Sequence, residues 1–188
     1  MKFGIKSVAF FALLAALIGA AIYVTVLRPS GPQVFDTPGF GQMTAQELSG
    51  DSYKIVPEML STIYRAFEET DETVIYDKLA QVSARDALET LYLERAGAMM
   101  GGGLADAAQP LHAMVLISLS SEPSGTTVSM NVKWHVLGTV GHAEHLHVRG
   151  NTYAANLTVE PIDGAWRMTR FDLTDVDRAD AGTMVGTE

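Results

Sequence analysis

The chain has no cysteine among its 188 residues. This absence excludes disulfide bonds, thiolate nucleophiles and cysteine-ligated zinc sites. The common short catalytic motifs are missing as well, since the sequence contains no G-x-S-x-G, Walker or H-E-x-x-H pattern. We therefore expect none of the activities that depend on these devices.

Basic residues are scarce. The chain has 13 Lys and Arg against 22 Asp and Glu, which gives a formal net charge of −9. No acidic residue precedes Asp36, so the remainder of the chain is more acidic than the total implies. Because an acidic domain repels phosphate backbones, nucleic acid is not expected as a partner.

A long apolar run lies near the N-terminus. Ser7–Leu27 carries no charge and stands between Lys6 and Arg28. A helix of this length would cross a hydrocarbon core of ~30 Å. The run is longer than the apolar part of a signal peptide and has no clear cleavage site, which favours a retained anchor over residues 1–28 against the alternative of a cleaved signal.

The charges around this run predict its orientation. Lys2 and Lys6 precede the run, and the acidic remainder follows it. The positive-inside rule then predicts a single-pass protein of a bacterial inner membrane, with the N-terminus in the cytoplasm and the C-terminal domain in the periplasm.

Residues 29–43 are rich in proline and glycine and are predicted to form a flexible linker. Helical signals follow this linker. Thr44 and Glu47 have the spacing of a capping box, and Pro57 suits the first turn of a second helix.

Two further helices are expected after these. Thr70 or Asp71 is predicted to cap the next helix, and Ser83 with Asp86 repeats the capping spacing before the last one. The helical half is expected to end at the glycines 101–103.

From Leu111 onward the apolar period changes to two, which is typical of strands. In the first of them the alternation places Ala113, Val115, Ile117 and Leu119 on one face. The long run 144–160 changes phase, and a single-residue bulge near Gly150 would restore one apolar face. A turn at Pro161–Gly164 is predicted before the last strand.

These patterns predict one α+β domain over residues 44–175, with helices packed in a strongly bent antiparallel sheet shaped like a cone. The polar residues 176–188 are predicted to be a disordered tail.

The order of elements from Pro57 to Asp175 resembles the nuclear transport factor 2-like superfamily, also called SnoaL-like or ketosteroid-isomerase-like. The residues that carry the resemblance lie in the first long helical pattern and in the last strand: Tyr64, Phe67, Tyr76, Asp163, Gly164 and Trp166. The resemblance implies a cone-shaped fold. It does not select a function, because the superfamily contains enzymes, small-ligand binders and assembly domains.

Together with the expected anchor, this layout is similar to that of the inner-membrane assembly subunit of type IV secretion systems. The similarity implies a periplasmic docking role, and it is architectural only. No interface residue can be carried over by motif.

Histidines gather in one short stretch. His142, His145 and His147 form an H-x-x-H-x-H pattern, and His135 lies on the polar parity of the preceding strand. Imidazole nitrogens bind Zn²⁺ and Cu²⁺. The pattern therefore predicts a candidate copper or zinc site formed by His142, His145 and His147, with His135 as a fourth ligand.

An interaction surface is the competing interpretation. Alternation would direct Leu146 and Val148 toward the core and leave His145, His147 and Arg149 facing solvent or a partner. The positive charge of Arg149 would disfavour a metal ion beside it. We expect this surface, within Gly138–Tyr153, to recognise a partner protein.

Catalysis has the weakest basis in the sequence. The polar residues expected inside the cone are Tyr64, Tyr92, His112 and Asn156, and no pair of them has a spacing that implies a mutual hydrogen bond. No catalytic or cofactor-binding residue is assigned. The sequence thus favours a membrane-anchored docking module of a larger envelope complex. A periplasmic metal binder, and a small-ligand binder or enzyme with a pocket inside the cone, are the alternatives.

Overall fold

The computed structural model describes residues 13–19, 31–100, 111–142, 145–177 and 183–184. The chain divides into two compact units, Met1–Gln33 and Val34–Glu188. In the first unit, residues 13–19 are helical and exposed.

The expected transmembrane anchor over residues 1–28 is not confirmed. Within the described ranges, no helix is both long and apolar enough to cross a membrane. Residues 1–12 and 20–28 of the expected anchor lie outside those ranges. The anchor therefore stays a prediction from the sequence.

The second unit is a mixed α+β domain. Its described residues form four helices and seven strands. Their bounds are β1 (Phe35–Thr37), β2 (Gly41–Met43), α2 (Ala45–Gly50), α3 (Ser52–Phe67), α4 (Glu72–Val82), α5 (Arg85–Met100), β3 (Leu111–Ser124), β4 (Thr127–His142), β5 (His145–Ile162), β6 (Ala165–Asp177) and β7 (Thr183–Met184).

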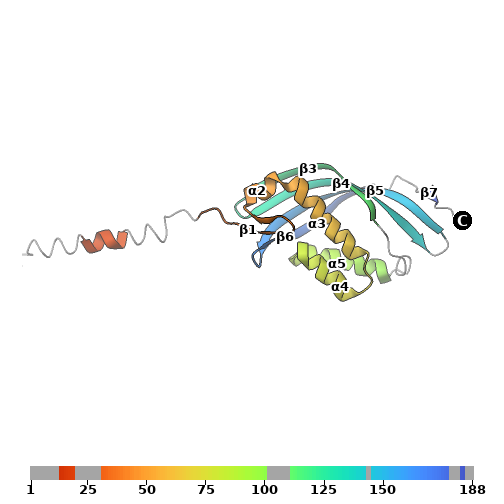
Figure 1. Cartoon of the computed structure of the whole chain (residues 1–188), viewed down its shortest axis with the longest axis horizontal. Coiled ribbons are helices and arrows are strands. Elements are labelled where there is room, and N and C mark those ends of the chain that lie inside the picture. Colours follow the sequence, from red (N-terminus) through yellow and green to blue (C-terminus); the bar gives the residue numbers. More distant parts are fainter. Residues whose placement is uncertain (1–12, 20–30, 101–110, 143–144, 178–182, 185–188) are drawn as a thin grey trace, which may run out of the picture. The chain divides into compact units, whose positions relative to one another are not determined.

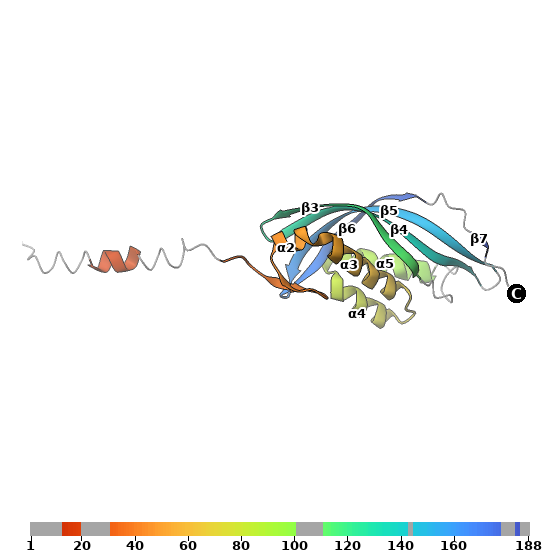
Figure 2. The ribbon, with the colours of Figure 1, turned by 45° about the horizontal axis from the view of Figure 1, so that its top comes forward.

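All seven strands belong to one sheet with the order β2-β1-β6-β5-β4-β3, and β7 pairs separately with β5. The four long strands β3 to β6 are antiparallel, whereas β1 joins β6 in parallel. The sheet is strongly curled, and α3, α4 and α5 lie on its concave side (Figures 1 and 2). This arrangement confirms the expected α+β class and is consistent with a cone of the nuclear transport factor 2-like type.

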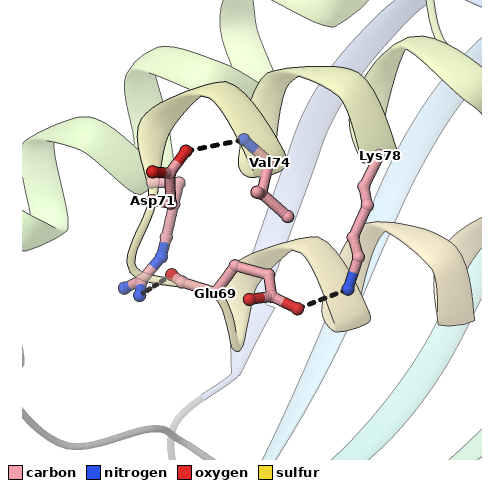
Figure 3. A network of polar contacts seen from close by, with 5 residues as sticks. Glu69, Asp71, Val74 and Lys78 are labelled. Carbon is pink, nitrogen blue, oxygen red and sulfur yellow. Dashed lines mark hydrogen bonds and ion pairs between the residues drawn. The ribbon is translucent and has the colours of Figure 1, made fainter.

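Two of the expected helix starts are confirmed because side chains close to them in sequence form the caps. Thr44 Oγ1 accepts a hydrogen bond from the backbone N–H of Glu47, and a Glu47 carboxylate oxygen accepts one from the backbone N–H of Thr44 at 2.8 Å. At the start of α4, Asp71 accepts hydrogen bonds from the backbone N–H group of Thr73 and from that of Val74, the second of which is drawn in Figure 3.

Two other expected starts are wrong. Helix α3 begins at Ser52, so Pro57 lies inside the helix rather than in its first turn. Ser83 does not cap α5, because it ends α4 and its hydroxyl donates to the Leu79 carbonyl oxygen at 2.7 Å. In both places burial of the neighbouring apolar residues outweighs the local signal.

The turn between α3 and α4 is held by polar contacts on both of its sides. The Lys78 ammonium pairs with the Glu69 carboxylate across the turn (Figure 3). Arg95 of α5 is buried, with 5% of its surface exposed, and it donates to the Glu69 carbonyl oxygen at 2.7 Å. Burial lowers the pKa of the Arg95 guanidinium. The hydrogen bond from Arg95 therefore connects the α3–α4 turn to α5.

Two tight turns connect the long strands. Gly125, at the first central position between β3 and β4, has φ +60°, as a type II′ turn requires. Between β5 and β6, Asp163 and Gly164 have φ values of +51° and +81°, which suits a type I′ turn.

Residues 35–43, expected to belong to the linker, are part of the folded domain. The β1–β2 hairpin lies against Trp166, a side chain with 0% exposure. The Trp166 indole N–H donates to the Met43 carbonyl oxygen at 2.9 Å, and the ring of Phe35 meets the indole edge-on at 5.4 Å. Burial of Trp166 therefore requires this hairpin.

The expected tail is also partly ordered. Strand β6 continues to Asp177, and Thr183–Met184 pairs with β5 as β7. Residues 178–182 and 185–188 lie outside the described ranges.

Candidate functional site

A hairpin arm formed by Gly138–Tyr153 contains the histidine stretch. Strands β4 and β5 continue past the helices at this end of the domain (Figures 1 and 2). Their pairing is uninterrupted and brings His142 directly opposite His145. The last pair of β3 with β4 is Leu111 with Gly138, so β3 does not flank the arm beyond that point.

The expected bulge near Gly150 is wrong. Gly150 pairs with Leu137 in the continuous β4–β5 ladder. The two register shifts of β5 instead lie further along, opposite β6, at Ala154/Ala155 and Thr158/Val159. Curvature arises there because β6 carries the extra residues, which sequence alternation within β5 could not show.

The uninterrupted register decides which residues of the arm share a face. Residues directly opposite in an antiparallel pair lie on the same face, and so do residues two apart on a strand. Counted from the Trp134–Tyr153 pair, positions 142, 145 and 147 share one register parity in the β4–β5 ladder. The side chains of Leu146 and Val148 lie outside what the structure describes, so their expected direction toward the core stays a prediction.

Arg149 has the same register parity as His145 and His147. The three positions expected to form an interaction surface thus lie on one face of the arm. The side chains of residues 139–149 lie outside what the structure describes, so contacts with a metal or a partner stay a prediction.

His135 lies on the opposite, convex face of the sheet. It follows Trp134 by one position, and its Nδ1 atom is 3.1 Å from the hydroxyl oxygen of Thr152 on β5. His135 and His142 have opposite register parity on β4, and because the side chain of His142 lies outside what the structure describes, the role of His135 as a fourth ligand stays a prediction. Among the side chains that the structure describes, no group of three or more His, Asp or Glu could hold a metal ion.

An aromatic cluster lies at the base of the arm on the core face. The ring of Trp134 stacks on Tyr153 at 5.5 Å and meets Phe171 edge-on at 6.3 Å. The indole N–H of Trp134 donates to the Tyr64 hydroxyl oxygen at 2.9 Å. Side chains from α3, β4, β5 and β6 thus meet at one point and support the arm.

Asn151 and Tyr153 extend this cluster into the arm. The Asn151 side-chain amide donates to the Tyr153 hydroxyl oxygen at 3.2 Å, while its buried Oδ1 atom has no hydrogen-bond partner among the described residues. The sequence analysis did not predict this aromatic cluster. Trp134 and Tyr153 lie at equal distances along the chain from the β4–β5 turn, but this spacing indicates a contact only once the position of the turn is known.

The residues considered for catalysis do not converge. Tyr64 lies in the aromatic cluster, where burial raises the pKa of its phenol. Tyr92 donates to Glu72 at 3.4 Å on the helical layer, and Asn156 accepts from the Asn131 amide on the exposed face of the sheet. His112 is exposed on β3. These positions give no support to an active site built from the four residues.

A second surface lies on β3, at the end of the sheet. The sequence pattern placed Val115, Ile117 and Leu119 on one face. In the structure Val115 and Ile117 are 57% and 53% exposed, whereas Leu116 and Leu119 pack on the core. The pairing with β4 shifts register between Leu116 and Ser118, which leaves Ile117 as an extra residue. This bulge reverses the parity that the sequence indicated.

No protein-family model matches the chain. No curated protein matches it either. Among solved structures, the intermembrane space region of the chloroplast protein ARC6 is similar to 64% of this chain and to 95% of its own length, with 14% identity and a TM-score of 0.44. A de novo designed β-sheet protein is similar over 73% of this chain and 92% of its own, with 14% identity and a TM-score of 0.34. Likenesses this weak carry no argument, so function must be inferred from the residues of this chain.

Proposed function

We propose that the chain is a membrane-tethered docking module whose hairpin arm, Gly138–Tyr153, binds another protein of a bacterial envelope complex. The observation that carries the proposal is the incomplete sheet around the arm. Beyond the Leu111–Gly138 and Thr152–Asp177 pairs, the described residues flank β4 and β5 only with the short strand β7.

A two-stranded ribbon is marginally stable in water by itself. A partner that adds a strand or packs on one face of the arm would supply the missing contacts. The aromatic cluster supports the base of the arm, because Trp134 contacts Tyr64 of α3 and Phe171 of β6.

Charge also supports the proposal. The arm contains three histidines and Arg149 against the single acidic residue Glu144, in a chain with a net charge of −9. Acidic partner surfaces that the rest of the domain repels can therefore approach the arm. The anchor expected over residues 1–28 would hold the domain in the periplasm at the inner membrane and raise its effective concentration near membrane partners.

The test uses the whole chain in cells. A photo-crosslinking amino acid is placed at Leu146 in the arm and, as a matched control, at Asp77 on the exposed side of α4. We expect a discrete protein adduct from position 146 and none from position 77. Equal adducts at both positions, or none at either, would contradict the proposal.

A shortened arm gives a second measurement. Replacing residues 140–147 by Asn-Gly joins Thr139 to Val148, which already lie opposite each other, through a type I′ turn. We expect this variant to keep the melting temperature of the domain to within a few degrees and to lose the crosslinked partner. If the partner is retained, the arm is not the recognition surface.

Metal binding is the second candidate, and the backbone pairing of His142 with His145, two residues from His147, supports it. Copper and zinc are titrated into the whole chain, into a variant with these three changed to alanine, and into a His112→Ala/His135→Ala control. Tight stoichiometric binding that the triple variant alone loses would establish the site. Absence of binding by the unmodified chain would eliminate it.

A further inference from the structure

The edge of β5 in the arm is partly covered by the C-terminal end of the chain itself. Strand β4 pairs along one edge of β5, and β6 pairs along the other edge as far as Thr152. Further along this second edge, His147 and Val148 lie opposite Met184 and Thr183 of β7 (Figure 1). The chain therefore places its own strand on an edge that a partner strand would need.

This cover is slight. Strand β7 is two residues long, whereas β6 runs alongside β5 from Thr152 to Ile162. From Asp177 to Thr183 the chain advances six residues while β5 advances four, from Thr152 to Val148, so β7 does not continue the register of β6. A strand held by so few backbone hydrogen bonds separates from a sheet at a much smaller cost than unfolding of the domain. Release of β7 would leave the β5–β6 ladder intact.

We propose that β7 is an exchangeable strand, which covers the β5 edge of the free arm and leaves when an extended strand of the partner pairs antiparallel with β5. The inference rests on the docking function proposed above. It assigns recognition to one edge of the arm, at His145–Asn151 of β5, and makes β7 a competitor of the partner within the same chain.

Charge indicates the chemistry of the strand that displaces β7. His145, His147 and Arg149 occupy alternate positions of β5 and share one register parity. Strand β7 places the uncharged Met184 opposite His147. Cross-strand pairs of opposite charge stabilise a sheet, so a segment with Asp or Glu at alternate positions would pair more favourably with this row than β7 does. We therefore expect the partner strand to be acidic at alternate positions.

Removal of β7 tests the exchange. The photo-crosslinking amino acid at Leu146 is placed in the unmodified chain, in a chain that ends at Asp177, and in a control that ends at Met184. The control loses residues 185–188 and keeps β7. We expect the adduct yield to rise about fivefold in the chain that ends at Asp177 and to stay unchanged in the control, because apparent affinity scales with the fraction of arms whose edge is open.

The direction of the change separates exchange from a purely structural role. A strand that only supports the arm would lower the adduct yield when it is removed. That result, or an equal yield from all three chains, overturns the exchange and leaves the docking function standing. Absence of any adduct in all three chains contradicts the docking function, and with it the inference that rests on it.

A disulfide lock provides the reverse test. Val148 and Thr183 lie directly opposite each other, within the Cα separation that a disulfide spans, and the chain has no cysteine of its own. We expect oxidation of Val148→Cys/Thr183→Cys to abolish the adduct from position 146 and reduction to restore it, with Thr183→Cys alone unaffected by either treatment. A locked chain that still captures the partner refutes the exchange, as do paired thiols that never form the disulfide.

Hydrogen exchange measures the cover in the absence of a partner. In mild detergent, we expect the backbone amides of residues 146–150 to exchange more slowly in the unmodified chain than in the chain that ends at Asp177. The amides of Ala155–Glu160 lie between β4 and β6 and should exchange equally slowly in both chains. Equal exchange of residues 146–150 in both chains would show that β7 does not cover β5 in solution and would overturn the inference.

Discussion

Tyr64 and Trp134 connect α3 to the sheet through a single hydrogen bond. Trp134 is 2% exposed, and its indole N–H has the Tyr64 hydroxyl oxygen as its acceptor at 2.9 Å. A buried donor without an acceptor is costly, which makes this pair a sensitive point in the core.

Tyr64→Phe should lower the free energy of unfolding by about 1–3 kcal/mol, because it leaves the Trp134 N–H buried and unpaired. Urea unfolding followed by circular dichroism measures the change. Tyr76→Phe, at a 48% exposed tyrosine, is the matched control and should have little effect. Equal losses in both variants would show that the hydrogen bond contributes nothing specific.

Burial raises the pKa of the Tyr64 phenol above its ordinary value of 10.0. The folded state therefore keeps the proton at a pH where the unfolded state has lost it. This contribution to stability is complete below pH 10 and decreases as the pH rises above it. We expect the urea midpoint to fall less steeply above pH 10 in Tyr64→Phe than in the unmodified chain; parallel curves would contradict this.

At the scale of elements, α4 depends on one side chain for its start. Asp71→Ala removes the acceptor of both the Thr73 and Val74 N–H groups and should cost about 0.5–2 kcal/mol of stability. Thermal unfolding measures it against Asp77→Ala, a change at an exposed site within the same helix. A larger loss from the Asp77 substitution would mean that the cap is not what stabilises the helix.

Alanine substitution is predicted to have opposite effects at two glycines, Gly164 in the β5–β6 turn and Gly97 in α5. Gly164 has φ +81°, so Gly164→Ala should destabilise the domain by about 1–2 kcal/mol even though nothing lies within 4 Å of the added methyl group. Gly97, in α5, has equally open space and no positive φ. Gly97→Ala should raise the melting temperature, because alanine favours the helix. Shifts of the same sign would contradict the conformational argument.

At the scale of the molecule, the domain is expected to begin at Val34 rather than at residue 44. A fragment of residues 34–188 should unfold cooperatively. Starting the fragment at Ala45 removes Phe35 and the Met43 carbonyl oxygen, which exposes Trp166 and leaves its indole N–H without an acceptor. We expect a loss of roughly 2–5 kcal/mol, measured by urea unfolding. Equal stability of the two fragments would show that the hairpin is dispensable.

Features that depend on neighbours along the chain could be predicted from the residues alone. The capping side chains Thr44 and Asp71, the turn at Asp163–Gly164 and the division into a helical and a β half follow from interactions within a few residues. The α+β class could be predicted for the same reason, since each element shows its own apolar period.

The face that each strand turns toward the core depends on its pairing with other strands, and the sequence pattern did not contain that pairing. Alternation is compatible with a bulge at any position, and the pairing has bulges at Ile117 of β3 and at two places on β6 rather than near Gly150. The bulge on β3 leaves Val115 and Ile117 exposed. The β1–β2 hairpin likewise became part of the domain only because Trp166, distant in sequence, needs its contacts to be buried. Register and burial arise from partners far along the chain, which a local pattern does not contain.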